Sequence, residues 1–111
     1  MEYPQEVVIG PHRVVVRELV GSKNIDDVGE ADTQSNIIVV RPGLAPSQEV
    51  ETILHEVVHF MLGGLPLGDP MEECVTVILG RALTAFIRDN PTWVRQFSTV
   101  LSEEKRKCLI P

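Results

Sequence analysis

Two histidines and a glutamate stand close together in the segment HEVVH at residues 55–59. On a helix, residues four apart lie one turn above each other on the same face, so the imidazoles of His55 and His59 can reach one metal ion. Glu56 lies about 100° around such a helix from His55, which places its carboxylate beside the metal rather than on it. There it can take a proton from a water that the metal activates. The segment predicts a zinc site with two histidine ligands and Glu56 as general base.

A catalytic zinc ion usually has a third protein ligand and one open position. In metzincins the motif continues as HExxHxxGxxH, but Leu62 and Leu65 stand where that glycine and histidine would be, which excludes this class. The remaining candidates for the third ligand are Glu73 and Glu72, near the start of the second predicted helix, and His12 in the N-terminal third.

The residues that begin the second predicted helix distinguish the two glutamates. Asp69 followed by proline is an expected N-cap, and Glu72 would then occupy the third helical position and bond the Asp69 backbone N–H. Adjacent helical side chains diverge by about 100°, so only one glutamate is expected to face the first helix. Thr76 and Gly80 share the face of Glu73, and their small size allows a close approach of the two helices. Glu73 is therefore favoured as the third ligand, with Glu72 as the alternative.

The elements that must position these residues follow from periodicity. Short segments rich in β-branched residues predict strands over 7–9, 12–20 and 36–40. The stretch 21–36 is polar and rich in turn-forming residues, and it predicts a long loop or hairpin tip.

Helical spacing of apolar residues begins after Pro46. The first helix is expected to start with Ser47 as N-cap and to end at Gly63. A second helix is expected over 69–88, and a third after Asn90-Pro91.

The third predicted helix carries Trp93, Phe97 and Leu101 at intervals of four, a stripe that is expected to pack in the core. Since the strands precede the helices, the fold class is α+β. We expect a single domain over residues 1–111, with a small, mostly antiparallel sheet packed against the three helices.

Composition limits the partners. The formal net charge is −6, which disfavours nucleic acid and anionic membranes. No segment approaches the ~18 apolar residues of a membrane span, and the first residues do not resemble a signal peptide. Cys74 and Cys108 form no CxxC motif. These features favour a cytoplasmic protein that is a monomer or a small homo-oligomer.

HEVVH followed by a glutamate on a second helix resembles the gluzincins, the zincin-fold zinc peptidases that bind zinc through two histidines and a glutamate. The stretch ECVTVILG at 73–80 is similar to the glutamate helix of thermolysin-like enzymes: Glu, a small polar residue at i+3, a bulky apolar residue at i+6 and Gly at i+7. The whole chain looks more like the very small phage and archaeal members and relatives of the ImmA/IrrE peptidases. This resemblance implies a zincin-like fold, a peptide or protein substrate, and zinc on His55, His59 and Glu73.

The chain departs from that family in two places. Val77 stands where thermolysin-like enzymes carry an aspartate that orients the first histidine ligand. No histidine follows the HEVVH segment, so the histidine that stabilises the transition state in larger relatives has no equivalent. Side chains that could stabilise an oxyanion instead are Tyr3, His12, Arg13 and Arg81.

Two interpretations compete with a peptidase. One is a zinc-binding regulatory or interaction module without turnover, and the other is a metal-free protein in which HEVVH is coincidental. The strand at 36–40 also has two interpretations: an ordinary sheet strand, or an edge strand that binds extended substrate by β-augmentation, as in zincin-like folds.

Overall fold

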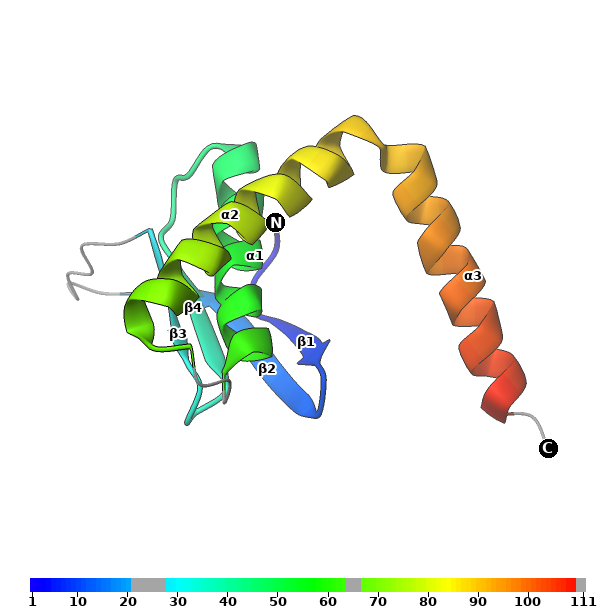
Figure 1. Ribbon diagram of the computed structural model, residues 1–111, viewed down its shortest axis with the longest axis horizontal. Coiled ribbons are helices and arrows are strands. Elements are labelled where there is room, and N and C mark those ends of the chain that lie inside the picture. The colour runs from blue at the N-terminus through cyan, green and yellow to red at the C-terminus, as the bar shows by residue number, and fades with distance from the viewer. Residues whose placement is uncertain (21–27, 64–66, 110–111) are drawn as a thin grey trace.

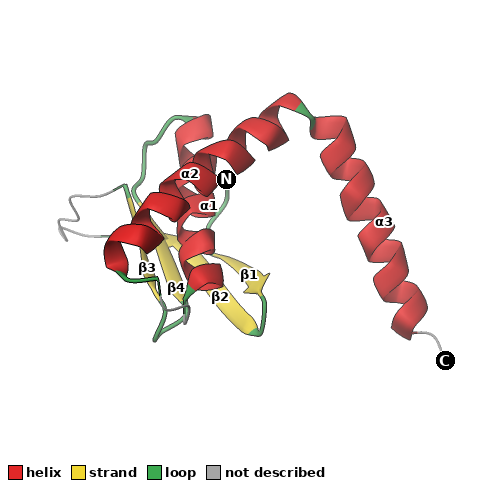
Figure 2. Ribbon diagram, viewed as in Figure 1, coloured by secondary structure: helices red, strands yellow, loops and turns green. Residues whose placement is uncertain are grey.

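Four short strands form one mixed sheet with the order β1-β2-β4-β3 (Figure 2). The two outer pairs are antiparallel, and the central pair, β2 with β4, is parallel. The protein is described by a computed structural model over residues 1–20, 28–63 and 67–109. Its strands are β1 (Gln5–Ile9), β2 (His12–Glu18), β3 (Gly29–Asp32) and β4 (Ile37–Val40), and its helices are α1 (Pro46–Leu62), α2 (Asp69–Asp89) and α3 (Pro91–Leu109). The fold is α+β, as the order of strands and helices predicts.

β3 was not expected, because it lies inside the polar stretch predicted as a loop. Its sequence GEAD contains no β-branched or aromatic residue, so local propensity does not favour a strand there. The strand forms by pairing with the apolar β4, from Gly29 opposite Val40 to Asp32 opposite Ile37. The first part of the predicted loop, residues 21–27, lies outside the described residues.

The core lies between the sheet and α1. β2 alternates in burial, with Val14 and Val16 buried and the residues on either side exposed, so one face of this strand is covered. The core cluster comprises Ile9, Val14, Val16, Ile38, Val40 and Phe60. On its other side α1 packs against α2, and among the described elements α2 contacts only α1 and α3. The layers therefore run from the sheet through α1 to α2 (Figure 1).

The helices begin slightly earlier than their predicted caps. Ala45 precedes α1 and Pro46 occupies its first turn, so Ser47 lies inside the helix and not at its N-cap. Gly68, with φ 77°, precedes α2 and Asp69 is already helical, with no side-chain hydrogen bond at the cap. Both differences follow from proline, whose fixed φ suits the first helical turn.

α3 does not pack on the core as expected. Figure 1 shows it leaving the end of α2 and running away from the sheet, and α2 is the only described element that it contacts. Trp93, Phe97 and Leu101 are 58%, 48% and 64% exposed. Periodicity identified the apolar stripe correctly, but periodicity cannot specify what covers such a stripe.

Gly29 of β3 packs against α1 at a position where no side chain fits. A Cβ at this residue would lie 2.5 Å from the Thr52 methyl carbon and 3.2 Å from the Val39 carbonyl oxygen. We expect Gly29→Ala to lower the free energy of unfolding by about 1–3 kcal/mol, because β3 must move away from α1. Chemical denaturation followed by circular dichroism measures this change.

Gly63→Ala is the matched control. Gly63 has φ −56°, and a Cβ there would make ordinary contact at 3.4 Å. This variant should unfold like the wild type or be up to about 1 kcal/mol more stable. Equal stability of the two variants would show that β3 does not lie against α1 as described.

Candidate metal centre

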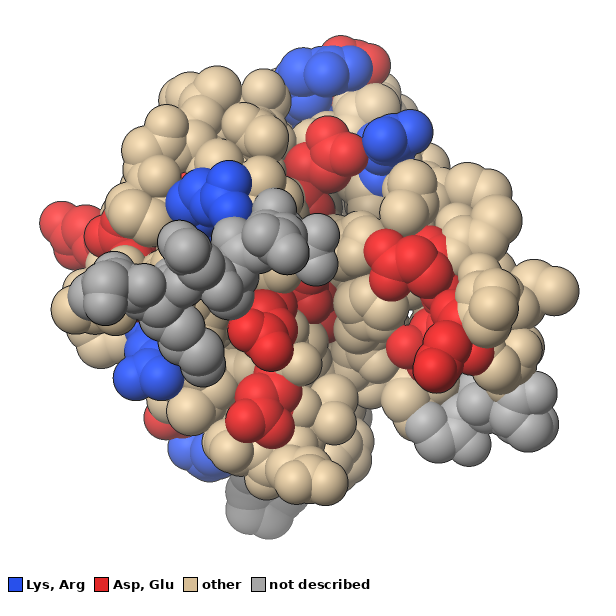
Figure 3. All heavy atoms as spheres, turned by 90° about the vertical axis from the view of Figure 1, so that its left-hand side faces the viewer, with Lys and Arg blue, Asp and Glu red and all other residues tan. Residues whose placement is uncertain are grey.

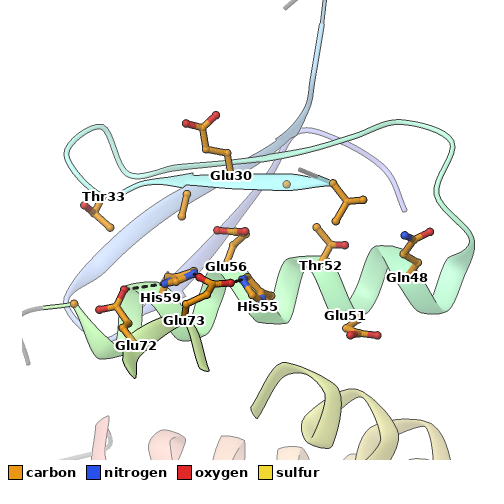
Figure 4. A pocket seen from close by; sticks show the side chains of 14 residues that line it. Glu30, Thr33, Gln48, Glu51, Thr52, His55, Glu56, His59, Glu72 and Glu73 are labelled. Carbon is orange, nitrogen blue, oxygen red and sulfur yellow. Dashed lines mark hydrogen bonds and ion pairs between the residues drawn. The ribbon is translucent and has the colours of Figure 1, made fainter. Parts of the chain in front are cut away.

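The side chains of His55 and His59 project from α1 toward the first turns of α2. There they meet Glu73: its Oε1 lies 3.1 Å from His55 Nε2, and its Oε2 lies 3.0 Å from His59 Nε2. One donor atom from each of the three residues can be chosen so that all lie within 4.8 Å of one another. Figure 4 shows the two imidazoles and the Glu73 carboxylate turned toward one another. Of the candidates for the third ligand, the structure brings Glu73 into this group.

The donor set and spacing fit a zinc ion. Two imidazole nitrogens and one carboxylate oxygen form a common ligand set of catalytic zinc. With bonds of about 2.1 Å, neighbouring ligand atoms of a tetrahedral site are about 3.4 Å apart. The two Nε2-to-carboxylate distances of 3.0 and 3.1 Å are close to that separation. The histidine side chains are only 24% and 19% exposed, whereas that of Glu73 is 56% exposed, so the group opens to solvent on the α2 side.

Glu72 contacts the same histidine from the other side of its ring. Its Oε2 lies 2.9 Å from His59 Nδ1, and side-chain capping of α2 is not seen at Asp69. The expectation that Glu72 serves the helix cap is therefore wrong. The expectation that only one of the two glutamates can face α1 is also wrong, because Glu72 reaches Nδ1 while Glu73 reaches Nε2.

This second contact has a chemical consequence for His59. A carboxylate accepts a hydrogen bond, so Glu72 favours the tautomer with the proton on Nδ1. The lone pair of Nε2 is then free for a metal. Histidine ligands commonly have a carboxylate partner of this kind, which fixes the orientation of the ring. Val77 cannot orient a histidine ring by a hydrogen bond. Glu72 provides such a bond, but to His59, the second histidine of the motif, whereas the aspartate of thermolysin-like enzymes orients the first.

Small residues allow α2 to approach α1 this closely. Thr76, Gly80 and Thr84 are the buried residues of α2. A Cβ at Gly80 would lie 3.4 Å from His55 Cα, so the backbones nearly touch at the first histidine. The predicted role of this small-residue face is confirmed.

Glu56 points away from the histidine group and toward β3 (Figure 4). It is 7% exposed and lines a groove of about 950 Å³ between β3, α1 and the start of α2. Both histidines and Glu73 line the same groove. The predicted general base is thus placed on the groove wall that also carries the predicted ligands.

The groove is strongly acidic. Figure 3 shows Asp and Glu side chains gathered on this face of the molecule. Among the described residues that line the groove there is no lysine or arginine, and its carboxylates come from Glu30, Glu51, Glu56, Glu72 and Glu73. This crowding of like charges favours a cation at the site.

None of the four side chains predicted to stabilise an oxyanion lines the groove. Arg13 pairs with Glu6, and Arg81 pairs with Glu51 from outside the groove. The ring of His12 lies 6.2 Å from that of Phe60, and His12 is not part of the metal-ligand group. Tyr3 packs against the core, and burial raises the pKa of its hydroxyl to about 12.

β3 supplies a wall of the groove that sequence reasoning missed. Gly29, Glu30, Ala31 and the nearby Thr33 line the groove, and β3 is an edge strand while β4 lies inside the sheet. Of the two interpretations of the strand at 36–40, the ordinary sheet strand is therefore confirmed, and the edge strand that binds substrate is wrong. No local signal identifies β3, although a glycine in an otherwise polar stretch is consistent with a close backbone contact.

Comparisons of the chain with models of known protein families, with curated proteins and with solved structures give no match. Within the described part of the chain, no helix has the length and apolar character needed to cross a lipid bilayer.

The two glutamates should differ in their effect on metal affinity. Glu73→Ala removes one of the three predicted ligands and should cause the largest loss of zinc affinity. Glu72→Ala removes only the partner of His59 and should weaken binding about 10–100-fold. Competition with a chromophoric chelator measures both.

Glu51→Ala is the control, since Glu51 lines the same groove but pairs with Arg81. Its zinc affinity should equal that of the wild type. A larger loss for Glu72→Ala than for Glu73→Ala would reverse the two assigned roles.

Gly80 offers a second pair of variants. Alanine makes ordinary contact with His55 at this position and is the better helix former by about 1 kcal/mol, so Gly80→Ala should keep zinc binding and be at least as stable. Gly80→Leu should push α2 away from α1. The resulting loss in the free energy of zinc binding should exceed the loss in the free energy of unfolding. Denaturation and chelator competition test both variants, and wild-type zinc affinity in Gly80→Leu would contradict the close approach.

Proposed function

We propose that this protein is a small zincin-like hydrolase that uses zinc to cleave peptide bonds. The observation that carries the proposal is the convergence of His55, His59 and Glu73 in a groove that also holds the buried carboxylate of Glu56. These are the four residues that the gluzincin resemblance assigns to the ligands and the general base.

His55, His59 and Glu73 would hold the ion. Zinc, when bound, would lower the pKa of a water molecule at its open position and polarise a substrate carbonyl. The chain's own contribution is to fix the ligand rings and to supply the base. Glu72 fixes the ring of His59, and Glu56 accepts a proton from the attacking water and returns it to the leaving amine.

The edge of β3 supports an extended peptide as substrate. Arg41 N donates to Val28 O, so Val28 is a hydrogen-bonded position of the β3–β4 pair. The carbonyl of Val40, which is opposite Gly29, instead accepts from Leu19 N on the other side of β4. Because the two kinds of position alternate along an antiparallel pair, the backbone N–H and C=O groups of Gly29 and Ala31 point away from β4. A peptide that pairs with these groups would lie along the groove by β-augmentation.

Transition-state stabilisation would come from groups of the groove wall. Neutral donors among the described lining residues are the backbone N–H groups at the β3 edge, the hydroxyls of Thr33 and Thr52 and the amide of Gln48. This is a weaker set than a charged side chain would provide, and we expect modest turnover.

A zinc-binding regulatory or interaction module without turnover is the second candidate. It is favoured by one observation: the groove-lining residues that the structure describes include no lysine, arginine or tyrosine, and no histidine besides the two predicted ligands. Such a module needs the ligands but not Glu56.

Substitution of Glu56 separates the two functions. Zinc-loaded wild type should cleave members of a broad peptide library, with products identified by mass spectrometry. Glu56→Gln should retain one zinc per chain and lose about 10²-fold or more in kcat, because the amide cannot take the proton.

Glu51→Gln is the matched control, an identical change at another glutamate of the groove. It should cleave at the wild-type rate. Equal rates for Glu56→Gln and wild type, or no cleavage by zinc-loaded wild type, would refute the peptidase and leave the regulatory module.

A further inference from the structure

α3 presents an apolar face with no partner in the described part of the chain. Trp93, Phe97, Val100 and Leu101 fall on one side of this helix and are all about half exposed or more. Figure 1 shows that only the start of α3 lies beside α2. A 19-residue helix with its apolar face in water gains little from packing, and it needs a surface to cover it.

α2 carries a matching surface along one flank and on the side that faces away from α1. Its buried residues Thr76, Gly80 and Thr84 define the side toward α1. Met71 and Ile78 lie on the opposite side, and a stripe at intervals of four and three runs along one flank of the helix: Leu79, Leu83 and Phe86. These five large apolar side chains are 39% to 60% exposed. Two exposed apolar faces on consecutive helices would ordinarily meet as a helical hairpin.

The connection between the helices prevents this within one chain. α2 ends at Asp89 and α3 begins at Pro91, so Asn90 alone joins them. Antiparallel helices in one chain need a loop of about 2–5 residues to reverse direction. A single linking residue is too short for α3 to fold back along its own α2, and short hinges of this kind favour exchange of the element between chains.

Charge indicates which surface receives α3, and in which direction. The first turn of α2 is acidic, with Asp69 and Glu72, and the last turn of α3 is basic, with Arg106 and Lys107. If α3 lay antiparallel along α2, these two ends would meet. α3 has four basic and two acidic residues, a net +2, and with a total of −6 the rest of the chain carries −8.

We propose that two copies of this chain form a two-fold symmetric dimer by exchanging α3, which lies antiparallel along the exposed apolar flank of α2 of the other copy. The nine large apolar side chains named above on α2 and α3 are between 39% and 64% exposed. At roughly 200 Å² for each side chain, they offer on the order of 900 Å² per chain, which reaches the ~800 Å² per partner of a stable interface. The acidic remainder of one copy attracts the basic end of the other.

Sedimentation equilibrium or light scattering on the full chain tests the dimer. Wild type should have twice the chain mass of 12.3 kDa at micromolar concentration. Phe97→Asp should shift it to the monomer mass, because a charge enters the apolar face. Ser102→Asp places the same charge on the opposite side of α3 and should leave the dimer intact. Zinc binding of Phe97→Asp should match the wild type, since Phe97 is part of neither the core nor the groove.

The two exposed cysteines report the arrangement. Cys74 lies in the second turn of α2 and Cys108 near the end of α3, so an antiparallel exchange brings Cys74 of one copy near Cys108 of the other. A short bis-maleimide should yield a covalent dimer with a Cys74–Cys108 link, identified by peptide mass spectrometry. A dimer linked only through Cys108 to Cys108 would overturn the exchange in favour of pairing between two α3 helices.

Other outcomes also overturn the proposal. A wild type that stays monomeric up to several hundred micromolar has no such interface. Dimerisation of Phe97→Asp that is as strong as that of the wild type would also show that this face of α3 is not the interface. A monomer that cosediments with anionic phospholipid vesicles, and loses this binding in Phe97→Asp, would identify a membrane surface as the partner of α3.

Discussion

The close approach of α2 to α1 at His55 and Gly80 is the constraint on which the site depends. A carboxylate on one helix can reach imidazoles on its neighbour only if the two backbones nearly touch, and glycine at position 80 permits that contact. The buried Thr76 and Thr84, one turn to either side, keep the same face small. α1 in turn is held by the sheet, whose buried valines and isoleucines pack against it. The position of Glu73 thus follows from packing several residues away from it.

The ring of His59 is held at both of its nitrogens. It lies between two consecutive glutamates of α2, one at each ring nitrogen. This arrangement leaves one nitrogen for a cation and fixes the plane of the ring. It also gathers negative charge in a groove whose described lining has no basic side chain apart from the histidines. A divalent cation would offset that charge, so the carboxylates that orient the His59 ring also favour a cation in the groove.

Much of the site could be predicted from the sequence, because its signals are local. The spacing within HEVVH and the small residues one and two turns after Glu73 each follow from helix periodicity alone. The role of Glu72 could not be predicted, since capping preference describes one helix by itself and not what lies across from it. β3 was missed for a similar reason: GEAD has no strand propensity, and it becomes a strand through its pairing with β4. The exposed stripe of α3 shows the same limit, because periodicity reveals an apolar face without its partner.

The central claim is that His55, His59 and Glu73 together hold one zinc ion, and anomalous diffraction from crystals of zinc-loaded protein tests it most directly. Zinc held by these residues should give a single strong peak within bonding distance, about 2.0–2.2 Å, of both Nε2 atoms and of the Glu73 carboxylate, with Glu72 on His59 Nδ1. The absence of a peak between the two histidines at saturating zinc would contradict it. So would an ion that is bound by Glu72 in place of Glu73.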